Sequence, residues 1–121
     1  LSLKSERASI ACWEFHLAIE KSIKVLIHLK SGSSKHGHNL DDLVEHLGQF
    51  ESGIDSSGLA GLPSDKDAIK LRYAEMIKTP IDAFEYYLIA LEFVGDIVSR
   101  LEHKIGIKNA SFILKMAPWA K

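Results

Sequence analysis

Histidine is the residue type in this chain best able to bind a metal or to move a proton near neutral pH, and the chain has six of them. His36 and His38 flank Gly37, directly after a turn rich in Ser and Gly. Transition-metal sites on helices need two histidines at i and i+4 or an acid at a set spacing, and no His-x-x-x-His occurs here. We therefore expect no dedicated metal site and no cofactor. His38, which precedes an Asn, is expected to pack or to cap a helix.

The sequence also has no motif of an activated nucleophile. There is no Gly-x-Ser-x-Gly and no Gly-rich loop followed by Lys and Ser or Thr. Cys12 lies among Ile10, Ala11 and Trp13, a setting in which cysteine is a small buried hydrophobe. Asp41 and Asp42 suit the first turn of a helix, where they complement its dipole. We expect no catalytic residue among these groups.

The elements that must position any site are helices. An uninterrupted amphipathic pattern predicts a first helix over residues 3–29, ended by Ser31-Gly32-Ser33-Ser34. Its buried face is expected to hold Ala11, Phe15, Ala18, Ile19, Ser22, Leu26 and Leu29. Lys21 and Lys24 fall on the polar side, where Glu20 and Lys24 form an i,i+4 pair.

Three further helices follow from start and stop signals. The second is expected to begin at Asn39 and to end near Gly48, and residues 51–64 read as a loop. The third begins at Ser64 and runs through Leu71-Arg72-Tyr73, and the fourth begins at Thr79-Pro80 and runs to Ile105. The fourth helix has two apolar stripes: Phe84, Leu88, Leu91, Gly95 and Val98, and Tyr86, Ala90, Phe93, Ile97 and Leu101. We expect it to be buried on both sides at the bundle centre, with a close helix approach at Gly95.

These elements predict an all-α fold, an up-down bundle of four to five helices in which the first and fourth helices pack together. At 121 residues the chain is expected to be one domain, residues 1–121, with a core over residues 3–105 and an apolar C-terminal tail over residues 106–121. Hydrophobic content of 46% and a single cysteine suit a folded protein of a reducing compartment, and we expect it to be cytoplasmic. No apolar run approaches the ~18 residues that span a bilayer, and we expect no signal peptide and no membrane partner.

A net charge of −1 argues against general binding of nucleic acid through phosphates. The charge is uneven: residues 39–56 carry five acids and no Lys or Arg, whereas residues 105–121 carry Lys108, Lys115 and Lys121 and no acid. A small basic groove for one nucleotide is compatible with this distribution.

Four segments, taken in order over residues 5–104, resemble the HEPN family of helical bundles. They are Ala18-Ile19-Glu20-Lys21-Ser22-Ile23-Lys24, His38-Asn39-Leu40, Leu71-Arg72-Tyr73, and the helix that Pro80 opens. The resemblance implies a helical bundle that is commonly dimeric. Some members look like nucleotide binders, and others are RNA-cleaving toxins of prokaryotic defence systems. The toxins depend on an Arg followed by a His about five residues later on a late helix.

That ribonuclease spacing is absent from this chain. Five positions after Arg72 is Ile77, five after Arg100 is Ile105, and Arg100 and His103 are only three apart. The departure places the chain with members that bind rather than cut. The resemblance then implies the ligand-binding residues Lys21, Lys24, His38, Arg72 and Tyr73. Arg and Lys side chains would meet phosphate, and Tyr73 would stack on a base.

We therefore expect a binding or assembly module without catalysis of its own. Its expected partners are a second copy of the chain and a nucleotide or a nucleotidyltransferase-like protein. Two alternatives stay open. One is a divergent HEPN ribonuclease of a toxin–antitoxin or defence system that uses Arg100 and His103. The other is a purely structural dimerisation domain.

Overall fold

The described part of the chain is a helical bundle. The computed structural model describes residues 3–34 and 37–105. Its elements are α1 (Leu3–Ser31), α2 (Leu40–Leu47), the short 3-10 helix η1 (Ser57–Gly61), α3 (Asp65–Arg72) and α4 (Pro80–Ile105). No strand occurs among the described residues, so the predicted all-α bundle is confirmed. The predicted apolar tail over 106–121 lies outside the described residues.

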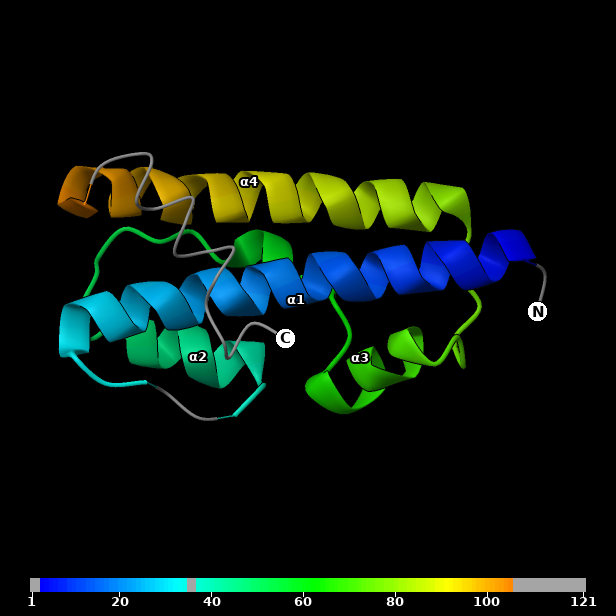
Figure 1. The fold of residues 1–121 in the computed structure, drawn as a ribbon, viewed down its shortest axis with the longest axis horizontal. Helices are drawn as coiled ribbons and strands as arrows, with labels where there is room; N and C mark the ends of the chain where they lie inside the picture. Colours follow the sequence, from blue (N-terminus) through cyan, green and yellow to red (C-terminus); the bar gives the residue numbers. More distant parts are fainter. Residues whose placement is uncertain (1–2, 35–36, 106–121) are drawn as a thin grey trace.

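The central helix of the bundle is α1. It packs against α4 along one side and against α2 and α3 on another, with α2 beside its C-terminal half and α3 beside its N-terminal half (Figure 1). The long helices α1 and α4 lie side by side and run in the same direction, because η1 and α3 lead the chain back to the starting end (Figure 1). The predicted packing of the first and fourth helices is therefore confirmed. The prediction that α4 is the helix at the bundle centre is wrong.

Two apolar clusters form the core. The larger lies between α1, α2 and α4 and includes Ile19, Ile23, Leu26, Leu43, Leu47, Ala90, Phe93, Ile97 and Leu101. The smaller lies under α3 and joins Cys12, Leu71 and Tyr86. Burial raises the pKa of the Cys12 thiol, which fits its predicted role as a small hydrophobe.

The outward face of α4 differs from the prediction. Phe84, Leu88 and Leu91 are 58%, 46% and 55% exposed, because α1 covers one face of α4 and no described element covers this one. A Cβ atom added at Gly95 would meet nothing within 4 Å, so this glycine marks no close helix approach. Only the stripe of Tyr86, Ala90, Phe93, Ile97 and Leu101 is buried.

The polar side of α1 also differs. Lys24 is 6% exposed and Leu29 is 36% exposed, the reverse of the predicted assignment. Helices α2 and α4 both pack against the C-terminal half of α1 (Figure 1), where residues 22–27 are all buried, so an amphipathic pattern no longer describes this stretch. Lys24 therefore does not lie on a solvent-exposed face of α1.

The predicted helix ends are confirmed. The Asn39 side chain accepts a hydrogen bond from the Asp42 N–H at 3.0 Å, and Ser64 accepts one from the Asp67 N–H at 3.3 Å. Gly32 closes α1 at φ +78°, a conformation that glycine adopts without a steric penalty. At the start of α4, Thr79 Oγ1 accepts from the Asp82 N–H at 3.1 Å while Asp82 Oδ2 accepts from the Thr79 N–H at 2.8 Å.

We expect Thr79→Ala to lower the free energy of unfolding by about 1 kcal/mol, because the Asp82 N–H would lose its acceptor. Thr79→Ser keeps the hydroxyl and should remain within about 0.5 kcal/mol of the parent chain in the same urea titration. The Thr79 N–H holds the pKa of Asp82 below its ordinary value. The stabilisation from the hydrogen bond between the Thr79 N–H and the Asp82 carboxylate is therefore fully present above a pH of about 4. It is lost as the pH falls through the lowered pKa of Asp82. An alanine variant as stable as the parent at pH 7 would contradict the assignment.

Candidate functional site

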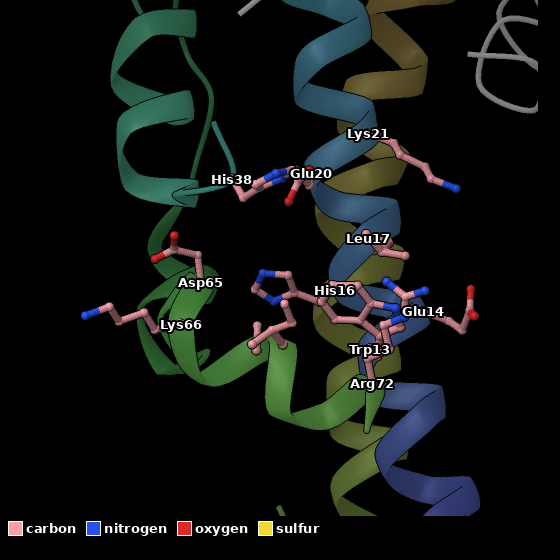
Figure 2. A pocket seen from close by; sticks show the side chains of 12 residues that line it. Trp13, Glu14, His16, Leu17, Glu20, Lys21, His38, Asp65, Lys66 and Arg72 are labelled. Atoms are coloured by element: carbon pink, nitrogen blue, oxygen red, sulfur yellow. Dashed lines mark hydrogen bonds and ion pairs between the residues drawn. The ribbon is translucent and has the colours of Figure 1, made fainter. Parts of the chain in front are cut away.

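A cavity of about 840 Å³ lies between α1 and α3 (Figure 2). Helix α1 contributes Trp13, Glu14, His16, Leu17, Glu20 and Lys21 to its lining. Helix α3 contributes Asp65, Lys66, Ala68, Ile69 and Arg72, and His38 comes from the segment before α2. The volume lies within the range of ligand pockets, about 300–1,000 Å³.

Packing and one buried hydrogen bond fix α3 against α1. Ala68 and Leu71 are buried on the inner face of α3, and the Ser9 hydroxyl of α1 donates to the Leu71 carbonyl at 2.9 Å. Trp13, Leu17 and Lys21 follow one another at four-residue intervals, so they lie along one line on the surface of α1. The cavity is therefore framed by two helices whose relative position the core determines.

Charged side chains surround the cavity. Its lining contains the cations Lys21, Lys66 and Arg72 and the acids Glu14, Glu20 and Asp65. Glu20 already has partners, because its Oε2 lies 3.2 Å from Lys24 Nζ and 2.9 Å from His38 Nδ1. Among the side chains that the structure describes, those of residues 3–34 and 37–101, the three lining cations have no ion-pair partner. Their charges are therefore available to an anionic ligand.

Three of the five candidates implied by the resemblance line this cavity. Lys21, His38 and Arg72 line it from three segments of the chain, and Figure 2 shows Lys21 directed away from His38. Lys24 does not line the cavity, since its ammonium is turned to Glu20 in the interior. Tyr73 is 61% exposed beyond the end of α3, where the guanidinium carbon of Arg72 lies 5.5 Å from the centre of its ring.

The cavity also contains Trp13, His16 and Lys66, which sequence reasoning missed. The four-residue spacing of Trp13, Leu17 and Lys21 is a signal that would have found Trp13. His16 is 1% exposed, and its Nδ1 lies 2.8 Å from the Tyr86 hydroxyl oxygen of α4. Burial lowers the pKa of His16 and raises that of Tyr86, so both groups are neutral near pH 7.

Comparison with known proteins gives one match. The sequence matches the family model described as "HEPN domain" over residues 1–116. The chain belongs to the HEPN domain family. No curated protein and no solved structure matches it. The resemblance seen in residues 18–24, 38–40, 71–73 and 80–105 is thereby confirmed.

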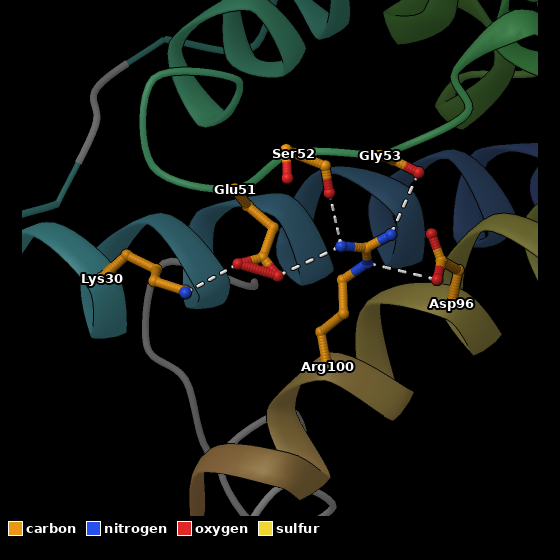
Figure 3. A network of polar contacts seen from close by, with 6 residues as sticks. All are labelled: Lys30, Glu51, Ser52, Gly53, Asp96 and Arg100. Carbon is orange, nitrogen blue, oxygen red and sulfur yellow. Dashed lines mark hydrogen bonds and ion pairs between the residues drawn. The ribbon is translucent and has the colours of Figure 1, made fainter.

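Arg100, which the ribonuclease alternative requires, is held in a separate polar network of this HEPN domain (Figure 3). Its guanidinium donates to Asp96 at 3.2 Å, to Glu51 at 3.1 Å, and to the carbonyls of Ser52 and Gly53 at 2.8 and 3.0 Å. A bond to Lys30 at 2.7 Å and the bonds to Arg100 keep the pKa of Glu51 below its usual value. Arg100 thus fastens the 51–53 segment to α4. The side chain of His103 lies outside what the structure describes.

The described part of this HEPN domain lacks a metal-ligand cluster and a membrane-spanning helix. No group of three or more His, Cys, Asp or Glu residues there is arranged to hold a metal ion. No helix there is long and apolar enough to cross a membrane.

Proposed function

We propose that this HEPN domain is a nucleotide-binding module and that its site is the cavity between α1 and α3. The observation that carries the proposal is the combination, in one cavity, of an indole ring with three cations that have no ion-pair partner among the described residues. Phosphate groups need such cations, and a base needs a flat apolar face. Arg72, Lys21 and Lys66 are the proposed phosphate contacts, and Trp13 is the proposed base contact.

This assignment changes the roles that the resemblance implied for two residues. The indole of Trp13 replaces Tyr73 as the stacking ring, because Tyr73 does not line the cavity. Lys24 is left out, because its ammonium is paired with Glu20. A Gly-rich loop presents a set of backbone N–H groups to phosphate, and none of the lining residues belongs to one. The start of α3 lies at the cavity, but the acids Asp65 and Asp67 in its first turn oppose an anionic ligand there. We therefore expect micromolar or weaker affinity.

Isothermal titration calorimetry with ATP, UTP and GTP tests the proposal. We expect saturable binding of at least one of them, weakened about tenfold by Arg72→Gln, because the variant loses a charged hydrogen-bond donor to phosphate. Lys70→Gln is the matched control: Lys70 lies on the same helix, is outside the cavity, and should leave the affinity unchanged. Absence of binding at millimolar nucleotide, or equal effects of the two variants, would contradict the site.

The position and hydrogen bonds of Arg100 favour a domain that binds nucleotide without catalysis. The three-residue spacing of Arg100 and His103 departs from the ribonuclease pattern, and Arg100 has four hydrogen-bond acceptors within the fold. Incubation of the domain with labelled RNA separates the alternatives. RNA cleavage that disappears in His103→Ala would favour the ribonuclease.

We further propose that the domain forms a dimer through the exposed apolar face of α4. This face consists of Ile81, Phe84, Tyr87, Leu88 and Leu91, which are 40–70% exposed and recur at three- and four-residue intervals. A second copy offers the same apolar stripe, as a two-fold interface requires. Residues 80–99 contain four acids and no Lys or Arg, so a partner copy of like charge must be held by apolar contact.

We expect Leu88→Asp to convert this dimer to a monomer in sedimentation velocity runs at ~100 μM protein, because it places a charge in the apolar contact. Ile10→Asp is the matched control, since Ile10 is 45% exposed on α1. Added salt should strengthen the parent dimer by screening the acids. A parent chain that stays monomeric at this concentration would refute the dimer.

A further inference from the structure

His16 is a buried side chain with one ring nitrogen unused by the fold. Its Nδ1 meets the Tyr86 hydroxyl at 2.8 Å, and among the described residues Tyr86 is its only hydrogen-bond partner. The residue is 1% exposed and yet lines the cavity, so the Nε2 edge is the part that reaches it. Figure 2 shows the His16 ring projecting from α1 into the space between α1 and α3.

The hydroxyl of Tyr86 determines which nitrogen of His16 carries the proton. Tyr86 is 5% exposed, and Nδ1 of His16 is the acceptor that the described residues offer to its hydroxyl proton. A buried hydroxyl that donates to nothing is costly. If Nδ1 carried the proton, the Tyr86 O–H would have no acceptor. Tyr86 therefore donates to Nδ1, and the neutral imidazole carries its proton on Nε2.

We infer that His16 presents its Nε2–H to the cavity as a fixed hydrogen-bond donor that reads an uncharged acceptor on the nucleoside part of the ligand, with Tyr86 as its positioning residue. The inference rests on the proposed nucleotide site. Lys21, Lys66 and Arg72 supply the positive charge that phosphate oxygens need. His16 is neutral and buried beside Trp13, with ring planes 5° apart and centroids separated by 6.4 Å. A neutral donor beside an aromatic face suits a ring nitrogen or carbonyl of a base.

The tautomer is tested on the protein without ligand. Long-range proton–nitrogen NMR correlations distinguish a protonated ring nitrogen from an unprotonated one. We expect the Nε2–H form in the parent chain and a shift toward the Nδ1–H form in Tyr86→Phe, which removes the hydroxyl. A parent chain with Nδ1–H, or a Tyr86→Phe variant with an unchanged tautomer, would overturn the inference whether or not nucleotides bind.

Recognition of the ligand by His16 is tested by calorimetry with ATP, adenosine and tripolyphosphate. We expect Tyr86→Phe to weaken ATP and adenosine about fivefold and to leave tripolyphosphate unchanged, because the variant misorients a single hydrogen bond to the base. In the parent chain, ATP and adenosine should each shift the Nε2 resonance, and tripolyphosphate should not.

The outcomes separate this inference from the proposed site. ATP binding that depends on Arg72 but leaves Nε2 unmoved would refute the role of His16 and preserve the site. A shift of Nε2 with tripolyphosphate alone would show that the donor reads phosphate, which contradicts the nucleoside assignment. Failure of all three ligands to bind, in a chain that also binds neither UTP nor GTP, would refute the site together with the inference.

Discussion

Replacing Glu20 by methionine is expected to lower the free energy of unfolding by about 3–5 kcal/mol, because it leaves a buried ammonium without its counter-charge. Lys24 Nζ lies 3.2 Å from Glu20 Oε2, and the two side chains are only 7% and 5% exposed. Exposed pairs of the same i,i+4 type contribute a few tenths of a kcal/mol. The large effect expected here comes from desolvation of the remaining charge.

The double variant Glu20→Met with Lys24→Met is the control. It removes both charges and keeps unbranched side chains of similar length, so its stability should return to within about 1 kcal/mol of the parent. Chemical denaturation of the three chains measures this. A single variant that loses less than about 1 kcal/mol would show that water reaches Lys24, contrary to its burial in the structure.

The second large effect is expected at the interface between α1 and α4. Ile97→Ala should lower the free energy of unfolding by about 2–5 kcal/mol, because it opens a cavity in a packed core. Ile97 is fully buried in the larger apolar cluster. The loss is measured as a lower urea midpoint of unfolding in the variant, with the dependence of the free energy of unfolding on urea concentration unchanged.

Leu88→Ala is the matched control on the same helix. Leu88 is 46% exposed, so in the monomer its truncation should lower the free energy of unfolding by less than about 1 kcal/mol. If Leu88→Ala lowers the free energy of unfolding of the dilute monomer as much as Ile97→Ala does, the assignment of the buried and exposed faces of α4 is wrong.

Helix ends were predictable because their signals are local. Asn39, Ser64 and Thr79 each accept a hydrogen bond from a backbone N–H three residues later, and such a contact is encoded within one turn. The burial of a helix face is set by distant elements. The two apolar stripes of α4 look alike in sequence, and only the position of α1 makes one of them core.

The site was predictable in part for the same reason. Lys21, His38 and Arg72 were identified by resemblance to a family, while their shared cavity depends on how α3 packs against α1. His16 carries no local signal, because its partner Tyr86 is 70 residues away along the chain. Lys24 was assigned to the polar side because helical periodicity does not show that three helices surround α1.

The most direct test of the nucleotide site is an NMR titration of the labelled domain with ATP, followed through the backbone amide resonances. We expect saturable shifts that are largest in residues 13–21 of α1 and 65–72 of α3, where the cavity lies. We expect small shifts in the Arg100 network of residues 51–53 and 96–100. Saturable shifts centred on residues 96–100, or no shifts at millimolar ATP and none when UTP or GTP takes its place, would contradict the proposed site.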